Sequence, residues 1–263
     1  NQDLSVHATV RSLDGIADRF PAESRKMIRS GVDANDFAEV IRTLAALRPD
    51  VVINCIGLTK HLPSAGDPLP SITINAQFPH RLALECRAAK VRLVHLSTDC
   101  VFDGKKGGYT EDDAPNAGDL YGQTKMLGEL RGPYGLTLRS SFIGHELGTR
   151  VQLVDWFLSQ SGSVRGFTKT LYSGLPTIEL ARVITDFVLP NPDLRGLYHV
   201  SSAPISKHDL LQLVARRYGK KIRIEPYDGF VLDRSLDSAR FRAETGCVPP
   251  PWEKLIDEMH SEY

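Results

Sequence analysis

The chain has 263 residues, a length that suits one large α/β domain or a domain with a smaller lobe. Lysine and arginine number 32, as do aspartate and glutamate, so no net charge favours binding to nucleic acid or to an anionic membrane. No apolar run approaches the roughly 18 residues that a transmembrane helix needs. The composition therefore predicts a cytoplasmic protein that binds neither nucleic acid nor membrane.

The cysteines and histidines show no pattern of a metal or disulfide site. Cys55, Cys86, Cys100 and Cys247 lie in apolar or interior-like settings without Cys-x-x-Cys spacing, which indicates reduced thiols. The histidines show no ligand spacing either. We therefore expect no bound metal.

Strands and helices alternate in the first half of the chain. In order, we predict a strand at residues 4–10, a helix at 37–47, a strand at 51–57, a helix at 73–89, a strand at 91–96, a helix at 121–130 and a strand at 135–138. The run 51–57 is continuously apolar, as in a buried parallel strand, and Pro79 should kink the second helix or mark its first turn. The alternation predicts a doubly wound parallel sheet.

The second half of the chain is predicted to be mainly helical. We predict helices at 153–158, 178–189, 206–218, 237–245 and 253–259, and a strand at 196–200. Ser206 can cap its helix, with Asp209 three residues later. We interpret residues 1–145 as a Rossmann domain and residues 146–263 mainly as a smaller substrate-binding lobe, with some segments returning to the Rossmann domain.

One expected motif is missing. A doubly wound nucleotide-binding domain normally begins with a strand, a glycine-rich turn and a helix whose N-terminus holds the pyrophosphate. These 263 residues contain no Gly-x-Gly-x-x-Gly, and the chain opens on what resembles the second strand of such a unit. We expect a strand–turn–helix of roughly 25–30 residues to lie upstream of Asn1. The alternative is that this protein has lost its cofactor cradle.

A proton-transfer site is predicted between residues 96 and 125. Thr98 follows an apolar strand, and Tyr121 and Lys125 stand one helical turn apart on the same face. A hydroxyl, a phenol and an ammonium would thus meet at the carboxyl ends of parallel strands. Ser97 is the rival hydroxyl, but strand alternation should point it the other way.

These residues belong to a longer ordered set of motifs. The set comprises Arg48-Pro49-Asp50-Val51-Val52-Ile53-Asn54, Asn75, Ser97-Thr98-Asp99, Tyr121-Gly122-Gln123-Thr124-Lys125, Leu138-Arg139-Ser140-Ser141, Gly174-Leu175-Pro176-Thr177 and Arg234-Ser235-Leu236-Asp237-Ser238. With it, the chain resembles the extended short-chain dehydrogenase/reductase family, and within that family the dTDP-4-dehydrorhamnose reductase branch.

The resemblance implies catalytic roles for three residues. Tyr121 would give a proton to the substrate carbonyl oxygen, and Thr98 would donate a hydrogen bond to the same oxygen. Lys125 would lower the pKa of Tyr121 from its usual value near ~10 and bind the nicotinamide ribose. Related dehydratases carry Thr-Asp-Glu here, so Cys100 disfavours dehydration. Asp99 would contact substrate, although it could equally cap a turn.

The cofactor is expected to be NADP(H) rather than NAD(H). NAD-binding folds usually place an acid after the second strand, whereas Arg11 and Ser12 follow Val10 here, and an arginine suits a 2′-phosphate. Arg11 could also be a solvated surface charge. By resemblance, the further cofactor-binding residues would be Asp33, Ala34, Cys55, Ile56, Gly57, Leu58, Asn75 and Ser141.

The implied substrate is a nucleotide-linked 4-keto-6-deoxy sugar. Phe142 stands where this branch usually has a tryptophan that stacks on the sugar. Lys60, His61, Arg150 and Lys169 could hold a diphosphate or be ordinary surface charges. Two alternatives remain: an epimerase with tightly bound NAD, and a non-catalytic protein like the regulatory β subunit of methionine adenosyltransferase. By resemblance the protein could form a homodimer.

Overall fold

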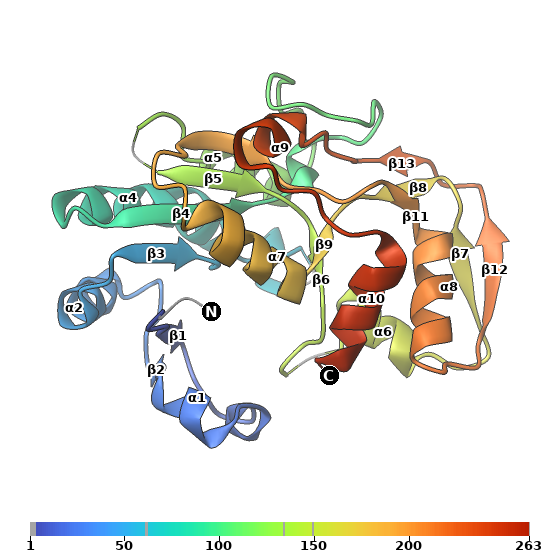
Figure 1. The fold of residues 1–263 in the computed structure, drawn as a ribbon, viewed down its shortest axis with the longest axis horizontal. Coiled ribbons are helices and arrows are strands. Elements are labelled where there is room, and N and C mark those ends of the chain that lie inside the picture. The colour runs from blue at the N-terminus through green and yellow to red at the C-terminus, as the bar shows by residue number, and fades with distance from the viewer. Residues whose placement is uncertain (1–3, 61–62, 134, 149, 263) are drawn as a thin grey trace.

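A parallel four-stranded sheet forms the centre of the molecule (Figure 1). The computed structural model describes residues 4–60, 63–133, 135–148 and 150–262. The strand order is β10-β5-β4-β3, with β10 at Gly196–His199, β5 at Leu136–Arg139, β4 at Arg92–Ser97 and β3 at Val51–Asn54. All three pairings are parallel, which confirms the predicted α/β sheet and brings the carboxyl ends of the strands to one edge.

Helices cover both faces of this sheet. On one face α2 (Phe37–Leu47) and α4 (Phe78–Ala88) form a core with Leu93 of β4. On the other face the helical segment of α7 (Thr177–Val183) and η5 (Ile184–Val188), together with α9 (Ala239–Thr245), packs on the sheet. These helices share a core with Val94 and Leu96 of β4 and with Leu136 and Leu138 of β5. Successive β4 side chains therefore pack in cores on opposite faces of the sheet, as strand geometry requires.

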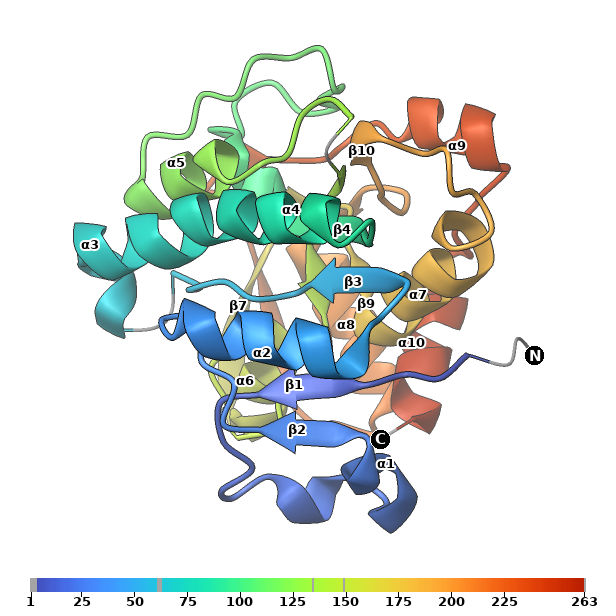
Figure 2. The ribbon, with the colours of Figure 1, turned by 90° about the vertical axis from the view of Figure 1, so that its left-hand side faces the viewer.

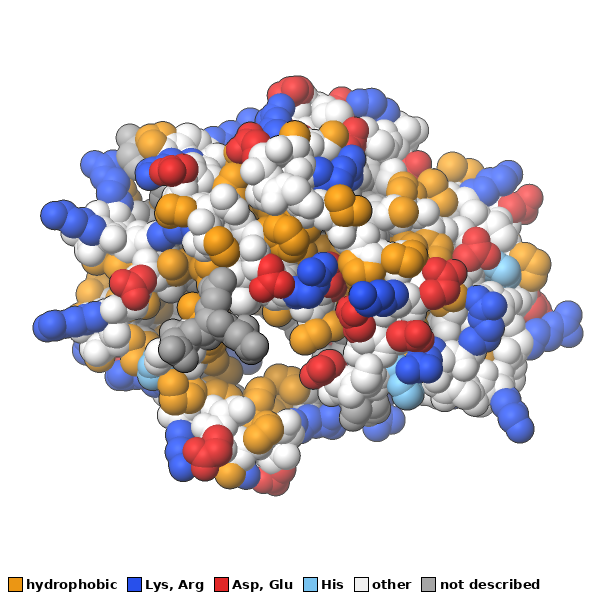
Figure 3. All heavy atoms as spheres, in the orientation of Figure 1, with side chains coloured by type: hydrophobic (Ala, Val, Ile, Leu, Met, Phe, Trp, Pro, Cys, Tyr) orange, Lys and Arg blue, Asp and Glu red, His pale blue; other side chains and the backbone are white. Residues whose placement is uncertain are grey.

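The first strands stand apart from this sheet. β1 (Ala8–Val10) and β2 (Ile28–Ser30) pair in parallel as a two-stranded sheet of their own, joined by η1 (Ala17–Arg19) and α1 (Ala22–Lys26). Figure 2 shows β1 below β3, running in the same direction, and Figure 3 shows an opening between this unit and the rest of the molecule. The prediction that β3 is buried is therefore wrong: β3 is an edge strand, and Ile53 is 41% exposed.

The helix predicted at 73–89 is longer and contains a π-helical segment. It runs through α3 (Pro68–Ser71), the π segment η3 (Ile72–Gln77) and α4. Pro79 lies in the first turn of α4 and is buried. Because proline lacks an amide hydrogen and its ring crowds the preceding turn, the wider π turn before it relieves that conflict. Asn75, inside the π segment, is turned toward the carboxyl edge of the sheet, where it bonds Leu58.

The second half forms a lobe beside the sheet, at the right of Figure 1. Its strands pair as β7 (Ser163–Phe167) with β12 (Arg223–Tyr227), β8 (Thr170–Tyr172) with β11 (Ile205–Ser206) and β13 (Leu232–Asp233), and β6 (Phe142–Ile143) with β9 (Leu175–Pro176). The helices α6 (Leu153–Ser159), α8 (Lys207–Arg217) and α10 (Trp252–Ser261) share one apolar core with them.

The predicted cap of α8 is confirmed, because the Ser206 hydroxyl accepts a hydrogen bond from the Asp209 amide. None of the helices in the described parts of the chain combines the length and apolar character needed to cross a membrane.

The helix α5 (Leu120–Leu127) carries the predicted Tyr121 and Lys125 and is held closely by its neighbours. Asp119 caps it by accepting from the Gly122 amide, at 2.7 Å. A Cβ at Gly122 would meet the Cys100 carbonyl oxygen of η4 (Asp99–Val101), and one at Gly128 would meet the Asn75 carbonyl oxygen. Glycine at these two positions lets α5 approach both η4 and the π segment.

We predict that Gly128→Ala lowers the free energy of unfolding by about 1–3 kcal/mol, the usual cost of overpacking a tight contact. The added methyl group would overlap the Asn75 carbonyl oxygen unless α5 shifts. Gly118→Ala is the matched control, because no atom lies within 4 Å of its Cβ position. Urea unfolding of both variants measures the difference, and equal midpoints would contradict the close approach.

Candidate active site

A cavity of about 620 Å³ lies at the carboxyl ends of β3, β4 and β5, and the second lobe closes its far side. Ten of the residues predicted from sequence line it: Cys55, Ile56, Gly57, Lys60, Thr98, Asp99, Tyr121, Lys125, Ser141 and Phe142. They come from segments far apart in the chain and are brought together by the parallel sheet.

Thr98, Tyr121 and Lys125 meet in this cavity. The Thr98 and Tyr121 side chains both line it, and Thr98 lies close enough to lower the pKa of Tyr121. The Thr98 hydroxyl also accepts from the Cys100 amide at 3.1 Å and donates to Asp99 Oδ1 at 3.3 Å. One turn after Tyr121, Lys125 is 5% exposed and its Nζ donates to the Leu96 carbonyl oxygen at 2.8 Å. A hydroxyl, a phenol and a buried ammonium thus form one cluster.

The pKa of Tyr121 lies well above its ordinary value, opposite to the expectation that Lys125 lowers it. Burial is the largest cause, and the nearby Cys100 acts in the same direction, while the Thr98 hydrogen bond opposes them. Asp99 and Asp119 raise it further. The phenol therefore keeps its proton at neutral pH, as a proton donor must.

Burial also shifts the pKa values of Lys125 and Cys100. It lowers the pKa of Lys125 to about 8, against the opposing influence of Glu129 and Cys55. It raises the pKa of Cys100 to about 11, with Asp99 contributing. At neutral pH Lys125 is thus largely an ammonium and Cys100 is a thiol. A thiol that holds its proton so firmly is a poor replacement for the glutamate of a dehydratase.

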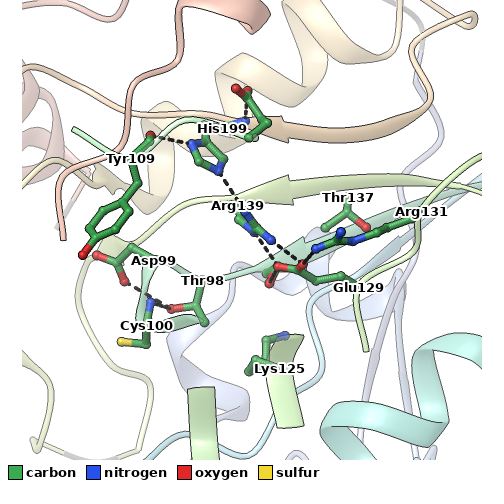
Figure 4. Close-up of polar contacts among 12 residues, drawn as sticks. Thr98, Asp99, Cys100, Tyr109, Lys125, Glu129, Arg131, Thr137, Arg139 and His199 are labelled. Carbon is green, nitrogen blue, oxygen red and sulfur yellow. Dashed lines mark hydrogen bonds and ion pairs between the residues drawn. The ribbon is translucent and has the colours of Figure 1, made fainter. Parts of the chain in front are cut away.

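Ser97 and Thr98 point to different partners. The Ser97 hydroxyl donates to Glu129 Oε1 at 2.8 Å, inside the protein, whereas the Thr98 hydroxyl bonds Asp99 and the Cys100 amide and lines the cavity. Figure 4 shows Thr98 next to Asp99 and Cys100, with the Glu129–Arg139 pair to the right. The choice of Thr98 over Ser97, made from strand alternation, agrees with this geometry.

The loop after β3 is fixed by Asn75. Asn75 Oδ1 accepts from the Leu58 amide at 2.8 Å, and its Nδ2 donates to the Leu58 carbonyl oxygen at 3.0 Å. A Cβ at Gly57 would lie 3.3 Å from Asn75 Oδ1 and 3.8 Å from Lys125 Nζ, so glycine keeps the backbone close to both. Cys55 is exposed, against the expectation of an interior setting.

Four predicted cofactor residues lie on or after the separate β1–β2 unit, outside the cavity lining. Arg11 is exposed, and the Ser12 hydroxyl accepts from the Asp14 amide. Asp33 Oδ1 accepts from the Asn35 amide, and Ala34 packs against the core beneath α2. The structure therefore does not bring these four together with Tyr121.

Two cationic residues that sequence reasoning missed, Lys207 and Arg234, line the cavity together with the predicted Lys60. Burial lowers the pKa of Lys207, and Lys60 and Arg234 lie near enough to contribute. Arg234 donates to the Phe102 carbonyl oxygen at 2.8 Å and contacts Cys100 Sγ at 3.5 Å. Arg234 belongs to one of the motifs that the chain shares with the family. For Lys207 the only local signal is its position directly after Ser206, the helix cap.

The other predicted cations do not join this group. Arg150 and Lys169 are exposed and absent from the cavity lining, and Lys169 pairs with Asp228 at 3.8 Å. His61 lies outside the described residues. Phe142 is 52% exposed, and a second aromatic residue, Trp156, also lines the cavity.

Comparison with known proteins places the chain in a family. Residues 11–263 match the model of the RmlD substrate binding domain. The chain belongs to this family. A solved dTDP-4-dehydrorhamnose reductase of Bacillus anthracis, in complex with NADP, shares its fold with a TM-score of 0.76 and 21% identity. That match covers 89% of this chain and 90% of the other.

Several named relatives resemble the chain. A dTDP-4-dehydrorhamnose reductase of Streptomyces griseus is 37% identical over 120 residues, 45% of this chain and 40% of the relative. A probable low-salt glycan biosynthesis reductase of Haloferax volcanii is 29% identical over 88% of this chain and 84% of its own length. The methionine adenosyltransferase 2 subunit beta of Xenopus tropicalis is 26% identical over 84% of this chain and 67% of the relative.

We predict that Asn75→Leu loosens the loop after β3. The Leu58 amide and carbonyl would lose their partners, so amide hydrogen exchange at residues 56–58 should rise roughly fivefold, equivalent to about 1 kcal/mol for one hydrogen bond. Exchange in α8 serves as the internal control, because that helix is remote from Asn75. Unchanged protection at 56–58 would contradict the anchoring role.

Proposed function

We propose that this chain is an NADPH-dependent reductase of a nucleotide-linked 4-keto-6-deoxy sugar, similar to dTDP-4-dehydrorhamnose reductase. The observation that carries the proposal is the meeting of the Thr98 hydroxyl, the Tyr121 phenol and, one turn away, the buried Lys125 amine in one cavity. Family membership and the relatives named as reductases support the same chemistry.

In this proposal Tyr121 delivers a proton to the carbonyl oxygen of the sugar. Negative charge develops on that oxygen during reduction, and the Thr98 hydroxyl stabilises it by donating a hydrogen bond. As the charge develops, the oxygen becomes basic enough to take the phenolic proton, and the Lys125 ammonium offsets the resulting phenolate. Asp99 sits beside Thr98 and is proposed to contact the substrate.

The residues at the nicotinamide end of the cavity fit the proposed cofactor. NADPH would supply the hydride. The exposed loop Cys55–Leu58 and the Lys125 ammonium offer backbone groups and a positive charge to a ribose, with Asn75 and Ser141 beside them. Gly57 fits this role because a side chain there would crowd Asn75 and Lys125. Arg11, exposed after β1, would serve a 2′-phosphate, with Ser12, Asp33 and Ala34 toward the adenosine.

At the other end, Lys60, Lys207 and Arg234 would hold the substrate diphosphate. The chain has no net charge, so a nucleotide-linked substrate requires such a local group of cations. Phe142 and Trp156 are the aromatic side chains that could stack on the sugar or base. The lobe of residues 146–263 supplies Lys207, Arg234 and Trp156, in keeping with a substrate-binding role.

A second candidate function is non-catalytic. The relative named as a subunit of methionine adenosyltransferase matches most of this chain, so a binding protein could share this fold. A stable hetero-partner, together with absence of ketosugar reduction, would favour that candidate over a reductase.

We predict that Tyr121→Phe lowers kcat by about 100-fold or more, because a positioned proton donor typically contributes that much. The assay follows NADPH absorbance with dTDP- or UDP-linked 4-keto-6-deoxyhexoses, using the full chain. Tyr227→Phe, on β12 and outside the cavity lining, is the control and should keep wild-type turnover. Absence of turnover in the wild type with every such sugar, or full turnover in Tyr121→Phe, would overturn the proposed function.

We also predict that Lys207→Met raises KM for the sugar nucleotide by roughly 10- to 100-fold, because a hydrogen bond to a charged group is worth about 1.5–3 kcal/mol. The effect on kcat should be smaller, since the phosphates do not react. Lys169→Met is the matched control, because Lys169 is an exposed lysine on the same lobe that does not line the cavity. Equal increases of KM in both variants would argue against a diphosphate site at Lys207.

A further inference from the structure

A buried ion pair lies directly behind the proposed catalytic residues (Figure 4). Glu129 follows the end of α5, and Arg139 ends β5; both side chains are 0% exposed. Arg139 Nε donates to Glu129 Oε1 at 2.6 Å, and Nη2 donates to Oε2 at 2.7 Å. This paired geometry fixes both side chains in orientation as well as in position.

The Glu129 carboxylate also holds the end of β4. Its Oε1 accepts from the Ser97 hydroxyl at 2.8 Å. Ser97 lies between Leu96, whose carbonyl oxygen accepts from Lys125 Nζ, and Thr98, which lines the cavity with Tyr121. The carboxylate therefore contacts the residue that separates the two attachment points of the proposed catalytic cluster.

Arg139 is itself anchored on its far side. Its Nη1 lies 3.2 Å from His199 Nε2, and His199 Nδ1 lies 3.0 Å from the Tyr109 carbonyl oxygen. Burial, and secondly Arg139, lowers the pKa of His199 to about 4, so this ring is neutral at physiological pH. Nδ1 then donates to Tyr109 and Nε2 accepts from Arg139. The guanidinium is thus held between a carboxylate and a neutral imidazole.

Lys125 faces titratable groups from three elements in the described chain. Glu129 lies one turn further along its own segment, Cys55 follows β3, and His95 lies in β4. Burial keeps the pKa of His95 well below its usual value, so the ring is neutral. Desolvation raises the pKa of the Cys55 thiol even though Cys55 is exposed along the cavity wall. Of these three groups, Glu129 supplies the negative charge.

We propose that Glu129 is a positioning residue for the reductase reaction. Its carboxylate fixes the end of β4 through Ser97 and provides the charge that holds the Lys125 ammonium in the site. The inference rests on the proposed function above. Stability alone is a weak reason for such a pair, because buried ion pairs are often no more stabilising than apolar side chains of similar volume.

The direction of the pH effect follows from the sign of the Lys125 shift. Burial lowers the pKa of Lys125 to about 8, below its usual value near ~10.4, so the ammonium is lost as pH rises through about 8. Glu129 opposes this loss. Removing its charge should move the alkaline limb of the kcat/KM profile to lower pH by about 1 unit or more.

The first experiment measures the charge directly in protein without substrate or cofactor. The ¹³Cε shift of Lys125, assigned with Lys125→Arg, is followed against pH in the wild type, Glu129→Gln and Glu129→Asp. We expect a lower Lys125 pKa in Glu129→Gln and a value close to wild type in Glu129→Asp, which keeps the carboxylate. Because Glu129→Gln leaves the buried Arg139 guanidinium without its carboxylate, the double variant Glu129→Gln/Arg139→Met, which removes both buried charges, is measured as well. The exposed Arg131, 3.5 Å from Glu129, keeps its charge in every variant. We expect the Lys125 pKa of the double variant to lie below wild type as well.

The second experiment tests positioning with the ion pair intact. Ser97→Ala removes only the hydrogen bond to Glu129, so kcat should fall several-fold while KM changes little and the Lys125 pKa stays near wild type. An unchanged kcat in Ser97→Ala would overturn the inference. So would a Lys125 pKa that is unchanged in both Glu129→Gln and Glu129→Gln/Arg139→Met. The NMR result does not depend on turnover, so it stands or fails separately from the proposed reductase activity.

Discussion

Exclusion of water from the carboxyl ends of β4 and β5 is the constraint on which the rest of the site depends. Ser97, Arg139 and His199 are all almost fully buried there, so their polar groups must satisfy one another. Each hydrogen bond in that region has few alternatives, because an unpaired buried polar group costs free energy. The result is a buried polar layer next to Thr98, and the Lys125 side chain reaches the Leu96 carbonyl oxygen beside it from α5.

The same exclusion of water determines the protonation states at the site. Burial disfavours charge, so it raises the pKa of Tyr121 and lowers that of Lys125 to about 8. The phenol and the amine are shifted in opposite directions by one cause. A protonated phenol beside a largely charged ammonium is the arrangement that proton delivery to a developing oxyanion requires.

The two halves of the molecule contribute different chemistry to one cavity. The sheet and α5 supply the hydroxyl, phenol and buried ammonium, whereas the second lobe supplies Lys207 and Arg234. In a chain whose opposite charges balance, this gathering of cations concentrates positive charge locally in the cavity. The apolar core shared by α6, α8 and α10 holds the lobe in shape.

The sequence by itself determined the local elements and the spacing of the proposed catalytic residues. The helix 37–47 has the predicted bounds because its apolar period and its Asp36 cap act within a few residues, and the same holds for Ser206 and α8. The i,i+4 spacing placed Tyr121 and Lys125 on one face, and strand alternation separated Thr98 from Ser97.

Only the tertiary structure decided which groups lose water and which strands lack a neighbour. An apolar run cannot show that β3 is an edge strand, because pairing joins residues far apart in the chain. The upward pKa shift of Tyr121, the gathering of Lys207 with Arg234, and the pairing of Glu129 with Arg139 likewise arise from burial and long-range contact. Local periodicity predicts the helices, the strands and the spacing of side chains along them. The pKa shifts depend on desolvation by segments that are distant in the sequence.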